Sequence, residues 1–189
     1  MRWLCCNIDA FSQADLQQAR AKLSPSRREY IDRLKHKQDQ DRSLAAELLL
    51  QQLLHRMDID TAVLHRKENG QPYLTGCDLQ VSISHSHGKV ACAVSRSPVG
   101  IDIERMDPIK LQMCRHVCTP EEKAYVLSGT SEDVFCQDLA VLQRFYEVWT
   151  AKEAWFKKLG TGITGLKSVN ILPMQRQFHT IDGYMVQIL

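Results

Sequence analysis

Alternation of apolar and polar side chains is clearest over residues 99–104. As a strand, this stretch puts its three aliphatic residues on one face and Gly100, Asp102 and Glu104 on the other. The two carboxylates then lie about 7 Å apart, from a rise of ~3.4 Å per residue. Two neighbouring anions favour a bridging Mg²⁺ or Mn²⁺, although an ordinary strand with a solvated acidic face fits the same residues.

Helical periodicity is strongest over residues 41–57, where apolar side chains recur at spacings of three and four. Arg42 extends this stripe at the predicted helix start, beside free N–H groups that favour a phosphate. An arginine that reaches out to solvent is the structural alternative. A second long helix is predicted over residues 134–159, ended by Gly160. Shorter helices are predicted after the capping residues Ser12, Ser24 and Thr119.

The remaining apolar stretches predict strands. One covers residues 2–9, and the turn at Asn69-Gly70 predicts a hairpin. Residues 79–86, 90–95 and 99–104 are predicted to form an antiparallel meander. His85 falls on the apolar face of its strand, where a buried core histidine is expected. Short strands are also predicted at residues 169–172 and 184–189.

Glu153 interrupts the aromatic stripe of the second long helix, four residues after Trp149 and three before Phe156. A buried carboxylate is costly without a charged partner. Lys157 could be that partner in a purely structural pair along the helix. In the functional alternative, Glu153 is a third oxygen ligand that faces the two acids of residues 99–104.

Charge is uneven along the chain, although the whole is nearly neutral. The 189 residues are 44% hydrophobic and carry a net charge of +2, which predicts one domain or two small subdomains and gives no sign of nucleic-acid binding. Residues 20–42 contain eight Lys or Arg against four acids. This local excess of positive charge favours an anionic ligand.

The seven cysteines contain no Cys-x-x-Cys pair, and Cys114, His116 and Cys118 offer too few ligands for a structural zinc. The amino terminus reaches a charge too soon for a signal peptide, and no apolar run approaches the ~20 residues of a membrane span. A cytoplasmic protein with reduced thiols is expected.

Four short motifs follow one another in an order that resembles a known family. They are Asn69-Gly70-Gln71-Pro72, Ile83-Ser84-His85-Ser86, Gly100-Ile101-Asp102-Ile103-Glu104 and the helical segment from Trp149 to Lys157. This set is similar to the 4′-phosphopantetheinyl transferase superfamily, in particular to its single-chain type represented by the surfactin-synthetase-activating enzyme. The segment from Asp39 to Ser43 resembles the arginine-bearing helix start of the family.

The resemblance implies an α/β (α+β) fold of two similar subdomains that form a pseudo-dimer, each a small antiparallel sheet packed against a long helix. Residues 1–105 would hold the coenzyme A-binding basic stretch and the acidic strand, and residues 106–189 the catalytic helix. It also implies transfer of 4′-phosphopantetheine from coenzyme A to a serine of an apo acyl or peptidyl carrier protein, with release of 3′,5′-ADP. Such an enzyme is expected to be a monomer without a nucleic-acid or membrane partner.

Residue roles carry over by resemblance. Asp102, Glu104 and Glu153 would hold Mg²⁺ or Mn²⁺ against the coenzyme A pyrophosphate. Glu153 would take the serine proton, directly or through a metal-bound water, and Lys157 would steady the phosphates. Coenzyme A is expected at Arg27, Arg28, Arg42, Gln71, Pro72, Ser84 and His85. The family usually has lysine where Gln71 stands, so this contact loses a charge.

Two other functions fit parts of the pattern. A metal-dependent phosphodiesterase or nuclease also uses clustered carboxylates and a lysine, but its usual Glu-x-Lys on a strand is absent, because Lys157 lies on a helix. A non-catalytic module that binds coenzyme A or a carrier protein would have a decayed site. The complete set of three carboxylates argues against decay.

Overall fold

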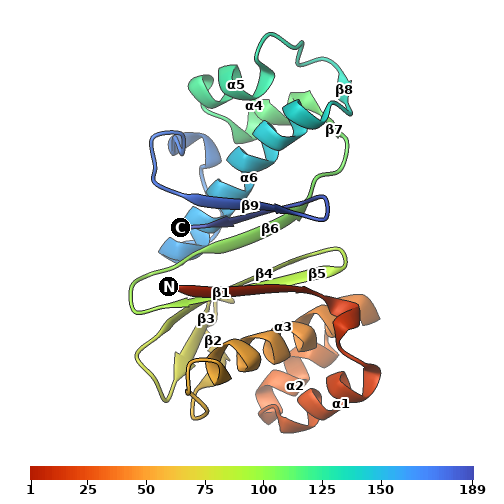
Figure 1. Cartoon of the computed structure of the whole chain (residues 1–189), viewed down its shortest axis with the longest axis vertical. Helices are drawn as coiled ribbons and strands as arrows, with labels where there is room; N and C mark the ends of the chain where they lie inside the picture. Colours follow the sequence, from red (N-terminus) through yellow and green to blue (C-terminus); the bar gives the residue numbers. More distant parts are fainter. The chain divides into compact units, whose positions relative to one another are not determined.

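The computed structural model describes all 189 residues, which form two compact units, residues 1–99 and 100–189. Each unit contains a three-stranded antiparallel sheet packed against one long helix, as predicted (Figure 1). The predicted boundary at residue 105 grouped the acidic strand with the amino-terminal half. That strand belongs instead to the second unit.

The sheet of the first unit has the order β1-β5-β4. Its strands are β1 (Arg2–Asn7), β4 (Gln80–Ser86) and β5 (Lys89–Ser95), and a separate hairpin is made of β2 (Val63–Arg66) and β3 (Pro72–Thr75). The helices are α1 (Gln13–Lys22), α2 (Pro25–Asp32) and α3 (Lys37–His55), with a 3-10 turn at Ile8–Ala10. Ser12 and Ser24 cap α1 and α2 as predicted, each accepting a backbone N–H of the first turn.

The leucine stripe of α3 forms the core of this unit. Leu49, Leu50 and Leu53 are buried and pack with the aliphatic side chains of β4 and β5. The helix begins four residues earlier than predicted, at Lys37. Arg42 therefore lies in its second turn, so the predicted position beside the free N–H groups of the helix start is wrong.

The sheet of the second unit has the order β6-β10-β9. Its strands are β6 (Ile101–Arg105), β9 (Gln177–Ile181) and β10 (Tyr184–Ile188), and β7 (Ile109–Lys110) pairs separately with β8 (Phe135–Cys136). The helices are α4 (Cys114–Val117), α5 (Pro120–Leu127) and α6 (Leu139–Leu159), with 3-10 turns at Leu111–Met113 and Leu166–Ser168. Thr119 and Glu122 form the predicted capping box of α5, and Gly160 ends α6 in a left-handed conformation.

The predicted meander is wrong in its third strand. β4 and β5 do form a hairpin, but the other edge of β5 pairs with β1, and β6 pairs with β10 from the far end of the chain. The alternation of side chains within a strand does not indicate which strand it pairs with when the partner is far away in the sequence. β9 was not predicted for a similar reason, since its residues are strand only through pairing with β10. Residues 169–172 do not form the predicted strand, and α6 starts at Leu139 because the two residues of β8 pair with β7.

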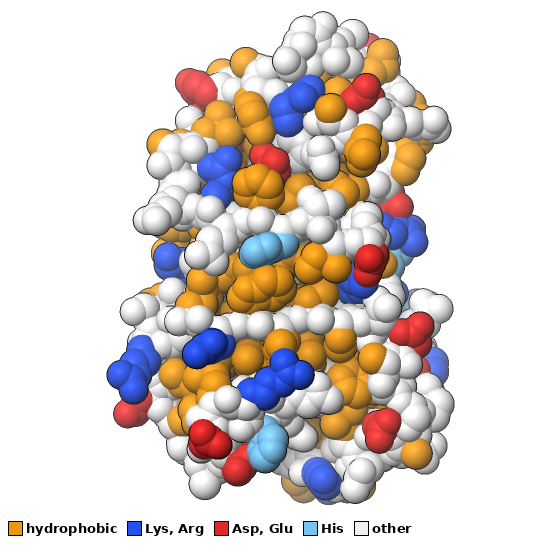
Figure 2. Space-filling view, in the orientation of Figure 1, with side chains coloured by type: hydrophobic (Ala, Val, Ile, Leu, Met, Phe, Trp, Pro, Cys, Tyr) orange, Lys and Arg blue, Asp and Glu red, His pale blue; other side chains and the backbone are white.

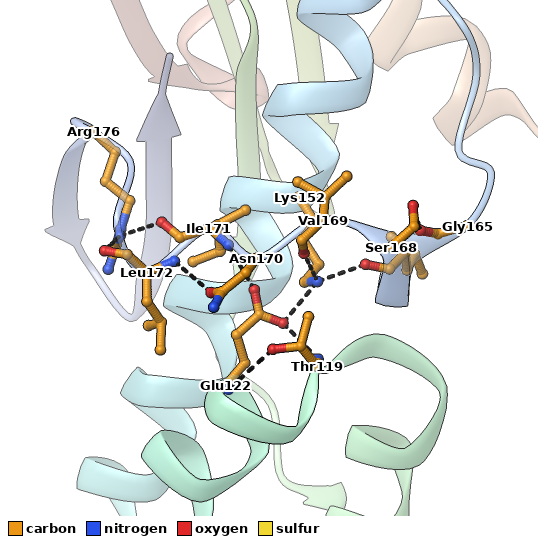
Figure 3. Close-up of polar contacts among 11 residues, drawn as sticks. Thr119, Glu122, Lys152, Gly165, Ser168, Val169, Asn170, Ile171, Leu172 and Arg176 are labelled. Carbon is orange, nitrogen blue, oxygen red and sulfur yellow. Dashed lines mark hydrogen bonds and ion pairs between the residues drawn. The ribbon is translucent and has the colours of Figure 1, made fainter.

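A buried ion pair fastens the segment that follows α6 to the helices of the second unit (Figure 3). The Lys152 ammonium lies 2.7 Å from Glu122, and both side chains are fully buried. Lys152 also donates to the carbonyl oxygens of Leu166 and Val169, each at 2.6 Å. Glu122 accepts the backbone N–H of Ile171 at 2.8 Å. Every polar atom of the pair is thereby satisfied, which offsets the cost of burying the two charges.

Candidate active site

The acidic face of β6 lies against α6. A Cβ atom added at Gly100, the residue before β6, would come within 1.8 Å of the Ala154 carbonyl oxygen. Asp102 and Glu104 share the face of Gly100 because side chains alternate along an extended chain. The close approach that this glycine permits is therefore that of the helix backbone, which carries Glu153 and Lys157 toward the acidic strand.

Glu153 is a buried carboxylate in an acidic environment. Its side chain is 7% exposed, and burial raises its pKa to about 7, with further upward contributions from Asp102 and Glu104. The positive charge of Lys157 acts in the opposite direction. Asp102 and Glu104 on β6 are thus close enough to Glu153 on α6 for their negative charges to raise its pKa.

Lys157 donates a charge-assisted hydrogen bond to Asp102, with 2.5 Å between Nζ and Oδ1. Asp102 is almost fully buried, whereas the lysine side chain keeps 29% of its exposure. The lysine thus bridges from α6 to β6, while it remains close enough to Glu153 to lower the pKa of that group. A cation already compensates part of the local negative charge.

The donors suit a hard divalent cation, although the structure holds no ready three-ligand cage of His, Cys, Asp or Glu side chains. Asp102, Glu104 and Glu153 offer only carboxylate oxygens, which Mg²⁺ and Mn²⁺ prefer. Mg²⁺ usually keeps several waters and binds through one or two carboxylates together with substrate phosphates. A preformed cage is therefore not required for these residues to hold Mg²⁺ once phosphates are present.

The two neighbouring arginines of α2, Arg27 and Arg28, have different surroundings in the first unit. Arg27 is buried, pairs with Glu47 at 2.7 Å and lines a cavity of about 410 Å³ together with Gly70 and Tyr73. Arg28 is half-buried and lines a different, more open hollow with Arg20 and Asp32. Of the two, Arg27 is the more deeply buried and lines the less open hollow.

Arg42 lines another cavity, of about 480 Å³, with Phe11 and His87. Its guanidinium pairs with Asp39 at 2.7 Å and donates to the His87 carbonyl oxygen at 2.9 Å. These bonds hold the end of the β4–β5 hairpin to α3. Arg42 and Arg27 thus line different cavities of the first unit.

His85 is exposed, so the expectation of a buried core histidine is wrong. It lies near the end of β4, two residues before the turn at His87 and Gly88, where this face of the strand is open. Ser84, in contrast, is 6% exposed. Ser82 and Ser86, which lie on the same face of β4 as Ser84, are also buried.

Gln71 and Pro72 lie at the start of β3 in the β2–β3 hairpin. The side-chain oxygen of Gln71 accepts a hydrogen bond from Lys67 at 2.9 Å, so an ammonium group stands beside this uncharged residue. Arg66, opposite Pro72 in the hairpin, lines the cavity of Arg27. The sequence analysis did not single out Lys67 or Arg66, because basic residues on a short hairpin are usually exposed to solvent.

On the face shown in Figure 2, acidic and basic side chains are interspersed, and neither sign forms an extended patch. The local positive charge of residues 20–42 is divided between buried and exposed groups, and several are paired with acids. Anion binding is thus better supported in the cavities lined by Arg27 and Arg42 than across the surface. No helix combines the length and apolar character needed to cross a membrane.

Two family models match consecutive parts of the chain and together cover residues 10–184. Residues 10–97 match the model described as 4′-phosphopantetheinyl transferase, N-terminal, and residues 98–184 the model of the 4′-phosphopantetheinyl transferase superfamily. The chain is 29% identical over 157 residues to 4′-phosphopantetheinyl transferase Sfp of Bacillus subtilis, covering 81% of this chain and 67% of the relative. It is 30% identical to 4′-phosphopantetheinyl transferase gsp of Aneurinibacillus migulanus, covering 75% of this chain and 57% of that relative. The matched part therefore spans about two thirds of the first relative and less of the second.

Proposed function

Because the chain belongs to the 4′-phosphopantetheinyl transferase superfamily, we propose that it transfers 4′-phosphopantetheine from coenzyme A to a serine of an apo acyl or peptidyl carrier protein. The observation that carries this proposal is that acidic residues of β6 lie near a carboxylate and an ammonium of α6. Lys157 donates a hydrogen bond to Asp102, and Asp102 and Glu104 raise the pKa of Glu153. A nuclease or a non-catalytic binding module is not favoured by these matches.

The reaction joins the serine oxygen to the phosphorus that bears pantetheine and breaks the bond from that phosphorus to the departing 3′,5′-ADP. The serine proton must leave as the new bond forms. Glu153 is the proposed acceptor, since a carboxylate whose pKa is about 7 is partly ionised and basic enough to take a proton near neutral pH. Its burial keeps bulk water from competing for the same position.

Asp102 and Glu104, with Glu153, are the residues proposed to hold Mg²⁺. When bound, the ion would neutralise charge on the pyrophosphate oxygens and align them for in-line attack. Lys157 is proposed to stabilise the negative charge that collects on the leaving 3′,5′-ADP. Its present partner, Asp102, keeps the ammonium oriented before substrate arrives.

Arg27, Arg42, Gln71, Pro72 and the Ser84-His85 pair of the first unit are the proposed coenzyme A contacts. Arg27 has the strongest structural support, because it is buried and lines a cavity. Arg28, which is half-buried and lines a more open hollow, has the weakest. The cytoplasm is the proposed compartment, in keeping with seven free thiols.

Mass spectrometry of an apo carrier protein incubated with the enzyme, coenzyme A and Mg²⁺ tests the proposal. We expect a gain equal to one phosphopantetheine arm, and no gain on a carrier variant in which alanine replaces the acceptor serine. Cleavage of a nucleic acid without this mass gain would support the nuclease instead. Complex formation with coenzyme A but no transfer under any metal condition would support a binding module.

A further inference from the structure

Gln187 is a fully buried amide on β10, the middle strand of the second sheet. Its register partner on β6 is Asp102, the carboxylate that accepts the hydrogen bond of Lys157. Paired residues of neighbouring antiparallel strands project to the same face of a sheet, with their Cβ atoms about 4.5–5.5 Å apart. Gln187 therefore stands beside one of the proposed metal ligands.

The face that carries Gln187 is the one that packs against α6. Met185, two residues earlier on β10, is the register partner of Glu104 and is buried in the core that contains Phe145 and Val148 of α6. Side chains two positions apart on a strand share a face. Gln187 is thus enclosed between the sheet and the helix, on the side where the acidic residues of β6 lie.

Only one end of the Gln187 amide is matched by a hydrogen bond. Nε2 donates to the Gln177 carbonyl oxygen at 3.0 Å, whereas Oε1 is buried and has no hydrogen-bond partner. The first bond fixes the orientation of the amide, because exchange of its two ends would bring Oε1 against a carbonyl oxygen. A buried acceptor without a donor is costly, and an apolar side chain of similar size would avoid that cost. Its place beside Asp102 indicates a ligand that supplies the donor.

A hydrated divalent cation meets this requirement. Mg²⁺ and Mn²⁺ keep several waters when they bind to carboxylates, and these waters donate hydrogen bonds to groups around the ligands. An amide oxygen can accept such a bond without adding negative charge. This matters here because Asp102 and Glu104 already act on Glu153 through their negative charges. A fourth carboxylate at position 187 would increase the repulsion.

We propose that Gln187 is a positioning residue of the cation site, whose amide oxygen stabilises the bound cation from the strand next to Asp102 without being one of its ligands. That the cation is the Mg²⁺ of a transferase rests on the proposed function. The role of Gln187 itself rests on its burial, its unmatched oxygen and its register with Asp102.

Binding of Mn²⁺, followed by electron paramagnetic resonance of the free ion, tests this role without any turnover. Wild type and Gln187→Met are titrated with Mn²⁺ in the presence of coenzyme A and without a carrier protein, and a protein-free sample serves as the blank. Methionine keeps an unbranched side chain of similar size but has no amide. We expect Gln187→Met to weaken Mn²⁺ binding by about 10- to 100-fold, the range typical for loss of a group that supports metal ligands.

Met185→Leu is the matched control, because it changes a buried side chain on the same face of the same strand while nearly conserving volume. It should leave Mn²⁺ affinity unchanged. Thermal melts without a cation separate this role from a structural one. Gln187→Met should melt at the wild-type temperature or above, because it removes an unmatched acceptor and leaves the Gln177 carbonyl on the exposed strand β9, where water can reach it. A large fall in melting temperature would make Gln187 structural and overturn the proposal.

Failure of this role and failure of the transferase function give different results. Mn²⁺ binding that depends on Gln187, without transfer to any carrier protein, would keep the role and reject the enzyme activity. Transfer by the wild type, together with equal Mn²⁺ affinity in wild type and Gln187→Met, would reject the role alone. A wild type that does not bind Mn²⁺ in the presence of coenzyme A overturns the proposal whatever the variants do.

Discussion

Lys157 Nζ and Asp102 Oδ1 lie 2.5 Å apart, although 55 residues separate them in the sequence. The pair joins α6 to β6 and places an ammonium among the carboxylates proposed to hold Mg²⁺. Glu153, one turn before Lys157, lies in the same environment, as its raised pKa indicates. Because of this arrangement, a structural role and a catalytic role of each residue can be told apart by measuring stability and transfer separately.

Glu153→Gln should abolish transfer without destabilising the ligand-free protein. The pKa of Glu153 is raised from 4.5 to about 7, so the native state disfavours the ionised form. The wild type therefore loses stability as pH rises from about 4.5 through 7, and the glutamine variant should not lose this part. Thermal melts should show that the melting temperature of the variant, relative to that of the wild type, is higher at pH 8 than at pH 5. Added Mg²⁺ should stabilise the wild type more than the variant. Marked destabilisation of the metal-free variant at pH 8 would mean that Glu153 serves the fold.

Asp102→Ala and Glu104→Ala should each leave a folded protein with no measurable transfer, because each removes a hard oxygen ligand from a small set. Asp102→Ala should also cost some stability, since it removes the partner of Lys157. The measurement is turnover as a function of Mg²⁺ concentration, with circular dichroism as the folding control. Wild-type turnover at limiting Mg²⁺ in either variant would contradict the metal assignment.

Gly100→Ala should reduce both stability and transfer. The added methyl group would collide with the Ala154 carbonyl oxygen, so α6 must shift away from β6. The shift would separate Lys157 from Asp102 and misplace Glu153, and loss of a productive geometry by an ångström is costly in catalysis. The urea concentration at the unfolding midpoint and the rate of turnover should both fall. An alanine variant with unchanged activity would show that the contact between β6 and α6 does not set the site.

Arg42→Ala should raise the Michaelis constant for coenzyme A more than that for the carrier protein. A phosphate contact made by arginine contributes about 1.5–3 kcal/mol. The comparison with 3′-dephospho-coenzyme A shows whether Arg42 contacts the 3′-phosphate, because a variant that has lost that contact no longer distinguishes the two substrates. Equal loss with every substrate, together with a lower melting temperature, would assign Arg42 to its observed bonds with Asp39 and the His87 carbonyl.

Lys152→Met should destabilise the protein by about 3–5 kcal/mol, because it leaves Glu122 as an uncompensated buried charge. Lys152→Met combined with Glu122→Gln should recover part of the loss, since no buried charge then remains. Lys158→Met, on the same helix and over the Trp155 ring, is the control and should cost much less. Urea denaturation measures all three. Equal stability of the two lysine variants would contradict the role given to the buried pair.

Several features of this protein follow from short-range interactions and could be predicted from the sequence alone. Capping side chains fixed the starts of α1, α2 and α5, because a serine or threonine oxygen binds N–H groups only two or three residues away. Periodicity likewise marked the buried stripe of α3 and showed that Glu153 lies among aromatic residues. The four motifs were enough to suggest the family, because their order is itself part of the sequence.

Tertiary structure decided what depends on contacts between distant segments. β6 pairs with β10 rather than with β5, and His85 is exposed although it alternates with buried residues. The same holds for Arg66 and Arg27, which are 39 positions apart and carry no local sign that they share a cavity. A sequence pattern reports the face that a side chain occupies on its own element. Which element covers that face is set by the packing of the whole unit, where the free energy of burial is gained.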